Sequence, residues 1–123
     1  MDKRYIAVDL DGTLATYDNW KPDGSIGEPI PEMINRVKQW LAEGHKVVIF
    51  TARVALDPTF YSAESKSHAD SAFVSKQYRI ISDWCSRYIG VILPITAQKD
   101  VRFTDFYDDR AWRVERNTGR IIE

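Results

Sequence analysis

The sequence predicts an α/β sandwich with a mainly parallel β-sheet. Four short apolar runs have the character of buried strands, and two segments with helical periodicity lie between the first three of them. A strand, a helix and a second strand in succession form a parallel βαβ unit, and joining such units gives this fold class. The chain has 123 residues, close to the commonest domain size, so residues 1–123 are expected to form one domain.

The four expected strands are short. Residues 5–8 and 46–51 are apolar runs of the kind that is buried on both faces of a sheet. Residues 90–95 include Pro94, which has no amide hydrogen and therefore shortens this strand or marks its end. In residues 101–107, every second residue is expected to face the same side of the sheet.

Two helices are expected between these strands. In residues 31–44, apolar side chains recur at helical spacing, Pro31 suits a first helical turn and Gly44 suits a C-terminal stop. The second helix is expected to begin near Ser71 and to end at Gly90. Its apolar stripe comprises Val74, Tyr78, Ile81, Cys85 and Tyr88, with Trp84 beside it.

Three segments do not fit the strand and helix pattern. Residues 15–29 are rich in Pro, Gly and Asp and are expected to form a short flap or loop. Residues 55–70 are a polar insertion that is longer than a strand-to-helix connection requires. Residues 112–123 are expected to form a hairpin that turns at residues 117–119.

The composition excludes several classes of protein. With 17 Lys and Arg against 18 Asp and Glu, the net charge is −1, which argues against a protein whose main task is to bind nucleic-acid phosphates but leaves room for a local basic patch. The single cysteine, Cys85, excludes an intrachain disulfide. No stretch resembles a signal peptide or a membrane span, so we expect a cytoplasmic protein with no membrane partner.

The residues that follow the first strand indicate a site that binds a cation and an anion. Asp9 and Asp11 leave this strand at the carboxyl edge of the sheet, where ligands bind in open α/β folds. Like charges this close are costly without a cation between them, and Mg²⁺ prefers such oxygen ligands. Gly12 lets the backbone bend sharply and approach an anion closely. An Asp- and Gly-rich surface turn would explain part of this pattern, but not two carboxylates directly after a buried strand.

Residues 9–13, DLDGT, resemble the first motif of the haloacid dehalogenase (HAD) superfamily, and the chain resembles a small phosphatase of that superfamily. The resemblance implies a Rossmann-like three-layer sandwich. It also implies that Asp9 is the catalytic nucleophile, which forms an aspartyl-phosphate, and that Asp11 is the general acid and base. The same residues would bind Mg²⁺, Asp9 through its side chain and Asp11 through its backbone carbonyl.

The second and third motifs of the superfamily have matches in the expected order. Thr51, at the end of the second strand, would donate a hydrogen bond to a phosphoryl oxygen, or alternatively would only cap a helix. Lys99, after the third strand, would offset the charge of the phosphate, with Arg102 as a less favoured substitute and an ordinary exposed lysine as the alternative. Gly12, Thr51 and Lys99 are therefore the expected substrate-binding residues. Arg53 would either contact the substrate or only lie on the loop surface, and the loop surface is the expectation.

The fourth motif is acidic and follows the fourth strand. Asp108 and Asp109 resemble the Asp-Asp form of this motif, so both are candidate ligands of Mg²⁺, with Asp108 preferred. Alternatively, Asp109 caps a turn or pairs with Arg110. Asp105 lies within the strand and is expected to be structural. The four motifs together span most of the chain.

These residues predict a Mg²⁺-dependent phosphomonoester hydrolase with a capless or minimally capped HAD-like core, because residues 15–29 and 55–70 are too short for a large cap domain. We expect a small phosphorylated metabolite or nucleotide as substrate. A phosphatase of polynucleotide ends or of phosphoproteins is the alternative, and an oligomer that closes the site is possible. A non-catalytic signalling receiver is disfavoured, because its acceptor aspartate would end the third strand, where residues 91–95 contain no acid.

Overall fold

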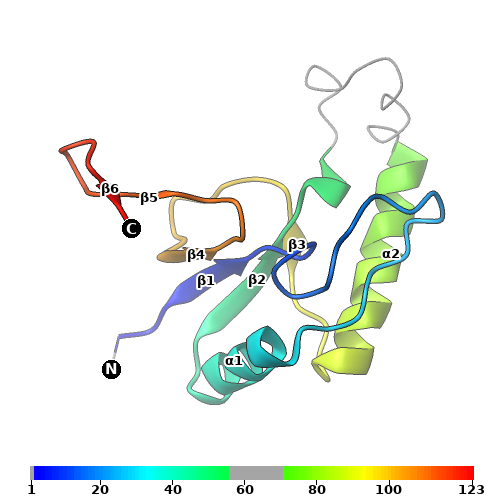
Figure 1. Ribbon diagram of the computed structural model, residues 1–123. Coiled ribbons are helices and arrows are strands. Elements are labelled where there is room, and N and C mark those ends of the chain that lie inside the picture. The colour runs from blue at the N-terminus through cyan, green and yellow to red at the C-terminus, as the bar shows by residue number, and fades with distance from the viewer. Residues whose placement is uncertain (1, 56–70) are drawn as a thin grey trace.

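A parallel four-stranded sheet forms the centre of the protein in the computed structural model, which describes residues 2–55 and 71–123 (Figure 1). The strand order is β3-β2-β1-β4, and each neighbouring pair is parallel. The strands are β1 (Tyr5–Val8), β2 (Lys46–Phe50), β3 (Ile95–Thr96) and β4 (Asp105–Tyr107). The predicted α/β fold with a mainly parallel sheet is therefore confirmed. The polar insertion predicted for residues 55–70 lies, apart from Ala55, outside the described residues.

Both expected helices are present, as α1 (Pro31–Ala42) and α2 (Ser71–Tyr88), and a short 3-10 helix, η1 (Ala52–Val54), follows β2. Pro31 occupies the first turn of α1, and Gly44 follows the helix with a φ of +87°. The apolar stripe of α2 differs from the prediction at one turn, because Gln77 is fully buried and Tyr78 is 40% exposed. The polar residue is tolerated inside because its side-chain oxygen accepts a hydrogen bond from Arg53.

The two helices cover the same face of the sheet. Their buried side chains form one core with alternate residues of the two central strands: Ile6, Val8, Val47 and Ile49 from the sheet, Ile34 and Val37 from α1, and Val74, Ile81, Trp84 and Cys85 from α2. On the opposite face, four aromatic rings contact one another with centroids 5.0–6.1 Å apart, namely Tyr5, Phe50, Phe103 and Phe106. The described residues thus form two layers rather than the predicted three.

The handedness of the strand-helix-strand connections explains why the described residues have helices on one face of the sheet only. The chain moves from β1 to β2 to β3 in one direction across the sheet, and right-handed crossovers in one direction place both helices on the same face. A helix on the other face would have to come from the segment after β4, which forms the C-terminal hairpin, or from the connection between β3 and β4. Residues 97–104 make that connection without a helix.

The third and fourth strands are shorter than predicted. The third was predicted at residues 90–95, but only its last residue pairs with β2, and Val91 and Ile92 are 49% and 64% exposed. The fourth was predicted at residues 101–107, but a turn begins at Asp100, whose carbonyl accepts a hydrogen bond from the Phe103 amide. Pairing of this strand with β1 therefore starts only at residue 105. In the third segment, Pro94 has no amide hydrogen to donate, although its carbonyl accepts a hydrogen bond from the Ile49 amide at 2.9 Å. In the fourth, the turn at Asp100 keeps residues 101–103 out of the ladder.

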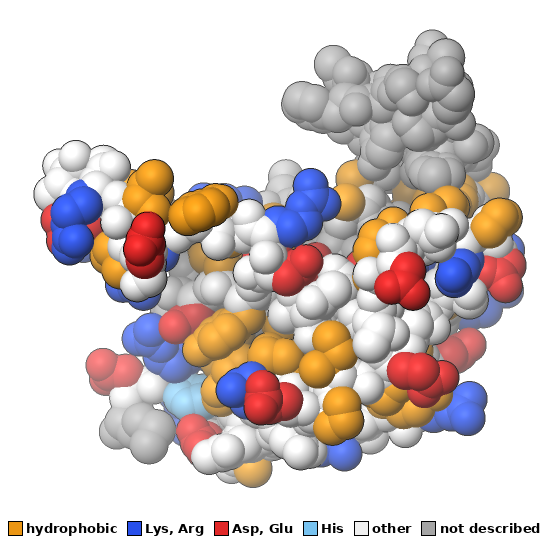
Figure 2. Space-filling view, in the orientation of Figure 1, with side chains coloured by type: hydrophobic (Ala, Val, Ile, Leu, Met, Phe, Trp, Pro, Cys, Tyr) orange, Lys and Arg blue, Asp and Glu red, His pale blue; other side chains and the backbone are white. Residues whose placement is uncertain are grey.

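The remaining segments are irregular or form a hairpin. Residues 15–29 form a loop closed at its base, where the Thr16 amide donates to the Glu28 carbonyl at 2.8 Å. The C-terminal hairpin is confirmed, with β5 (Arg113–Val114) antiparallel to β6 (Ile121–Ile122), and it extends from the sheet beside β4 (Figure 1). Figure 2 shows positive and negative side chains interspersed over this view of the molecule. Among the described residues, no helix combines the length and the apolar character needed to cross a bilayer.

Candidate active site

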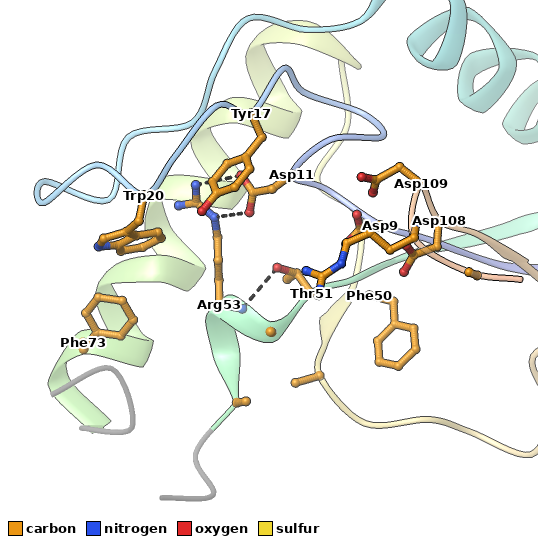
Figure 3. A pocket seen from close by; sticks show the side chains of 15 residues that line it. Asp9, Asp11, Tyr17, Trp20, Phe50, Thr51, Arg53, Phe73, Asp108 and Asp109 are labelled. Atoms are coloured by element: carbon orange, nitrogen blue, oxygen red, sulfur yellow. Dashed lines mark hydrogen bonds and ion pairs between the residues drawn. The ribbon is translucent and has the colours of Figure 1, made fainter. Parts of the chain in front are cut away.

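A cleft of about 790 Å³ lies at the carboxyl edge of the sheet, where β1, β2 and β4 end (Figure 3). Parallel strands direct the residues that follow them to the same edge, so side chains far apart in sequence meet there. The lining residues come from all three strand ends, from the loop of residues 15–29 and from α2. They include Asp9, Asp11, Tyr17, Trp20, Phe50, Thr51, Arg53, Phe73, Asp108, Asp109 and Arg110.

Three of the predicted metal ligands come together in this cleft. Asp9, Asp108 and Asp109 each offer a carboxylate oxygen, and these oxygens all lie within 4.8 Å of one another. The Thr13 hydroxyl lies 3.3 Å from an Asp9 oxygen and 3.1 Å from an Asp109 oxygen, and it accepts a hydrogen bond from the Asp109 amide. Because the hydroxyl has a single hydrogen, the two carboxylates share it. Thr13, to which the sequence analysis assigned no role, thus holds the acids together.

The three carboxylates carry negative charge that no described cation balances directly. Burial first, and then the nearby charges of Asp108 and Asp109, together raise the pKa of Asp9 from its ordinary value of 3.8 to about 7. A donor set made only of carboxylate oxygens, crowded and under-neutralised, suits a hard cation such as Mg²⁺. The residues present therefore fit the metal that the resemblance implies.

Gly12 is required by two features of the turn after β1. Its φ is +91°, a value that side chains disfavour, and a Cβ at this position would lie 2.6 Å from an Asp109 carboxylate oxygen. The turn therefore bends sharply, as expected of this glycine, and brings the backbone directly against the Asp109 carboxylate. The expected approach of Gly12 to a bound anion stays a prediction.

Replacing Gly12 by Ala is expected to destabilise the protein more than replacing Gly90 by Ala. Both glycines have a positive φ, but a Cβ at Gly90 would meet nothing within 4 Å. Backbone strain of about 1–2 kcal/mol is common to both variants, so the difference between them isolates the clash with Asp109. Urea unfolding measures both values, and equal destabilisation would contradict the close approach.

Asp11 does not join the three acids, because its side chain pairs with Arg53 (Figure 3). The guanidinium Nε and Nη2 donate to the two Asp11 carboxylate oxygens at 2.7 and 2.9 Å. Arg53 is only 7% exposed, so its expected position on the loop surface is wrong. A charged group this deeply buried requires a partner, and the carboxylate supplies it.

The remaining donors of Arg53 are also used. They reach the Gly24 carbonyl at 2.6 Å, the Ser25 carbonyl at 3.2 Å and the Gln77 side-chain oxygen at 2.9 Å. Arg53 therefore joins η1, which follows β2, to the loop of residues 15–29 and to α2. This link spans segments 24–42 residues apart in sequence, so the local pattern around Arg53 contained no sign of it.

Thr51 lies at the cleft as predicted, and it also performs the capping role that was its alternative. The residue is 4% exposed, its hydroxyl oxygen accepts a hydrogen bond from the Arg53 amide at 3.2 Å, and it thereby caps η1. The bond uses the oxygen as acceptor and leaves the hydroxyl hydrogen available to a ligand oxygen.

Lys99 lies beside the acidic group but outside the larger cleft. It lines a neighbouring cavity of about 200 Å³ together with Asp9, Phe50 and Asp108, and its Nζ lies 5.3 Å from the centre of the Phe106 ring. The less favoured substitute, Arg102, pairs with Asp100 at 2.7 Å and lines neither cavity.

The structure distinguishes the two acids of the fourth motif. Asp108 accepts a hydrogen bond from the Arg110 amide at 2.8 Å, which is the turn-capping contact that was the alternative for Asp109. Asp109 instead bonds Thr13. Asp105 pairs with Arg4 at 2.8 Å and is structural, as expected.

Comparison with known proteins supports the fold. No family model matches the chain, and no curated protein matches it. The solved structure of a conserved protein from Bacteroides thetaiotaomicron is similar, with 22% sequence identity over 89% of this chain and 78% of the other, and a TM-score of 0.54. The superposition indicates a shared fold, and 22% identity gives no information about the reaction.

Proposed function

We propose that the protein is a Mg²⁺-dependent phosphomonoester hydrolase that acts through an aspartyl-phosphate on Asp9. The observation that carries this proposal is the meeting of Asp9, Asp108 and Asp109 within 4.8 Å in a cleft at the carboxyl edge of the sheet. The resemblance of residues 9–13 to the first HAD motif supports it. A HAD-like core without a large cap is part of the same proposal.

In the first step, an Asp9 oxygen attacks phosphorus. A bond forms between that oxygen and phosphorus, the bond from phosphorus to the ester oxygen breaks, and Asp11 gives its proton to the departing oxygen. In the second step, Asp11 accepts a proton from water, whose oxygen attacks phosphorus and frees Asp9. The products are an alcohol and inorganic phosphate.

Asp11 has to exchange partners during this cycle. Both of its oxygens accept hydrogen bonds from Arg53, so at least one must be released and must take a proton from water before the carboxyl group can give that proton to the ester oxygen. The Arg53 pair therefore defines a resting position of the proposed acid and base.

The other residues of the site would hold the phosphoryl group and the metal. The Thr51 hydroxyl would donate to a phosphoryl oxygen, and Lys99 would place its charge near the same group. The side chains of Asp9, Asp108 and Asp109 and the backbone carbonyl of Asp11 would hold Mg²⁺. When bound, the ion neutralises the carboxylate and phosphoryl charges that otherwise repel each other. Gly12 keeps the turn close enough for these groups to act together.

Inorganic phosphate release from p-nitrophenyl phosphate tests the proposal. We expect release with Mg²⁺, loss of release with chelator, and recovery when Mg²⁺ is restored. An Asp108→Asn variant is expected to need about 10–100-fold more Mg²⁺ for half-maximal rate. Release at an equal rate in chelator would contradict the metal requirement. Incorporation of one phosphoryl group per chain without turnover would instead favour a signalling receiver.

The substrate class proposed on these grounds is a small phosphorylated metabolite or nucleotide. The cleft of about 790 Å³ falls in the range of small-molecule sites. Phosphorylated polynucleotide ends and phosphoproteins remain the alternatives, and a panel that contains all four classes separates them.

A further inference from the structure

The larger cleft has two chemically different ends. Figure 3 shows Asp9, Asp108 and Asp109 at one end, and Tyr17 and Trp20 at the other, on the side of Asp11 and Arg53. Asp9 and its neighbours are the groups proposed above to act on phosphorus. The second end is the place for the part of a substrate that the reaction releases.

This second end has little capacity to bind an anion. Its buried cation, Arg53, has five N–H groups, and all five donate to protein oxygens: two to Asp11, two to the Gly24 and Ser25 carbonyls, and one to Gln77. The Asp11 carboxylate also balances its charge. A phosphate or carboxylate of a ligand would find no donor left on Arg53, so an uncharged group fits this end better.

This end of the cleft has an aromatic surface, formed by Trp20 and Tyr17. The Arg53 guanidinium lies 4.9 Å from the centre of the Trp20 ring, and the centres of the Trp20 and Phe73 rings lie 5.7 Å apart. The contacts with Arg53 and Phe73 hold the Trp20 ring in place in the wall of the cleft. Tyr17 lies in the same wall and is 46% exposed, although a large aromatic side chain is costly to leave in water.

Tyr17 also brings a polar group. Its hydroxyl makes no hydrogen bond to any residue within 2–55 or 71–123, so it is available as a donor or acceptor at the edge of a stacked ring. A ring with nitrogen or oxygen atoms at its edge would use both the face of Tyr17 and its hydroxyl. A purely aliphatic group would use neither.

We propose that the substrate is a phosphate monoester whose leaving group carries a planar heteroaromatic ring, which stacks on Tyr17 beside Trp20. A nucleoside monophosphate is the simplest member of this class. The proposal rests on the proposed hydrolase function. Hydrolysis breaks the bond between phosphorus and the ester oxygen, so the nucleoside leaves with a proton on that oxygen and the phosphate leaves after attack by water.

The test compares kcat/KM for a nucleoside 5′-monophosphate with kcat/KM for ribose 5-phosphate, which lacks the ring. The wild-type ratio is expected to exceed about ten, the effect of one base stacked on an aromatic side chain. Tyr17→Leu is expected to lower this ratio about ten-fold, and Tyr17→Phe, which keeps the ring face, is expected to retain most of it. Tyr78→Leu is the matched control, because Tyr78 is a 40% exposed tyrosine on α2 that does not line the cleft.

A wild-type ratio near one, or a ratio that Tyr17→Leu leaves unchanged, would overturn the proposal. Calorimetric titration of the same proteins with the nucleoside monophosphate separates this result from failure of the hydrolase function. Binding that weakens in Tyr17→Leu without any phosphate release would support the ring site and contradict hydrolysis. Phosphate release with no preference for the ring would support hydrolysis and contradict the ring site.

Discussion

Replacing Asp9 by Asn is expected to lower kcat for phosphate release by at least about 10³-fold, because an amide oxygen does not attack phosphorus as a carboxylate does. The fold should persist, since the Asp9 backbone amide still donates to the Tyr107 carbonyl and the Thr13 hydroxyl can donate to the new amide. Rates are measured with saturating substrate and Mg²⁺, and circular dichroism checks the fold. Asp83→Asn, an exposed change on α2 outside the cleft, is the control and should keep the wild-type rate.

The same Asp9 variant is expected to be more stable than the wild type when Mg²⁺ is removed. The pKa of Asp9 is about 7 in the folded protein and ordinarily 3.8, so ionisation of this group opposes folding. The penalty is complete above pH 7 and disappears as the pH falls towards 4. Allowing for solvent screening, we expect a gain of about 1–2 kcal/mol in the variant at pH 8.

Urea unfolding at pH 8 and at pH 4.5, with chelator present, measures this gain. The difference in unfolding free energy between the variant and the wild type should shrink at the lower pH. A variant that is less stable than the wild type at pH 8 would show that the three acids do not repel one another as described.

Replacing Arg53 by Met is expected to cost about 3–5 kcal/mol of stability. The change leaves the Asp11 carboxylate without its cation and removes the donors to the Gly24 and Ser25 carbonyls and to Gln77. Methionine fills a similar volume, so the loss reports on the charge and hydrogen bonds more than on packing. Urea unfolding measures the cost.

A surface pair supplies the control for Arg53. Arg36 lies 3.6 Å from Glu32 on α1, and their side chains are 49% and 81% exposed. Arg36→Met should therefore change stability by less than about 0.5 kcal/mol. Arg53→Lys should recover only part of the lost stability, because an ammonium group cannot make the bidentate contact with the Asp11 carboxylate. An Arg53→Met cost similar to that of Arg36→Met would contradict the structural role.

Local pattern was sufficient to predict most of the fold. Pro31 and Gly44 bound a periodic apolar segment, and the helix between them follows from that segment alone. The third layer was a different kind of inference. It came from the resemblance, and the part of the chain that the structure describes does not show it. Both described helices lie on one face of the sheet, and residues 97–104 connect the outer strands without a helix. The apolar character of Val91 and Ile92 led to a strand prediction that is wrong for these two residues, because apolar character alone does not show which residues pair with a neighbouring strand.

The candidate site was predicted where residues follow strand ends, and missed where contacts are long-range. Asp9, Asp108 and Asp109 were expected together because their motifs resemble those of a known family, and the structure brings them together because parallel strands deliver the residues that follow them to one edge. The bond between Thr13 and Asp109 joins residues 96 apart, and the pair of Arg53 with Asp11 joins residues 42 apart. The residues next to Thr13 and Arg53 in the sequence give no indication of these partners, so only the three-dimensional arrangement reveals the two contacts.

The most direct test of the proposed mechanism is to locate the phosphoryl group during turnover. The protein is mixed with p-nitrophenyl phosphate and Mg²⁺, quenched in acid within one turnover, digested and examined by mass spectrometry. We expect one added phosphoryl group on the peptide that contains Asp9, more of it in Asp11→Asn, where attack by water lacks its base, and none in Asp9→Asn. Phosphate release without any adduct at Asp9, or undiminished release by Asp9→Asn, would contradict the account.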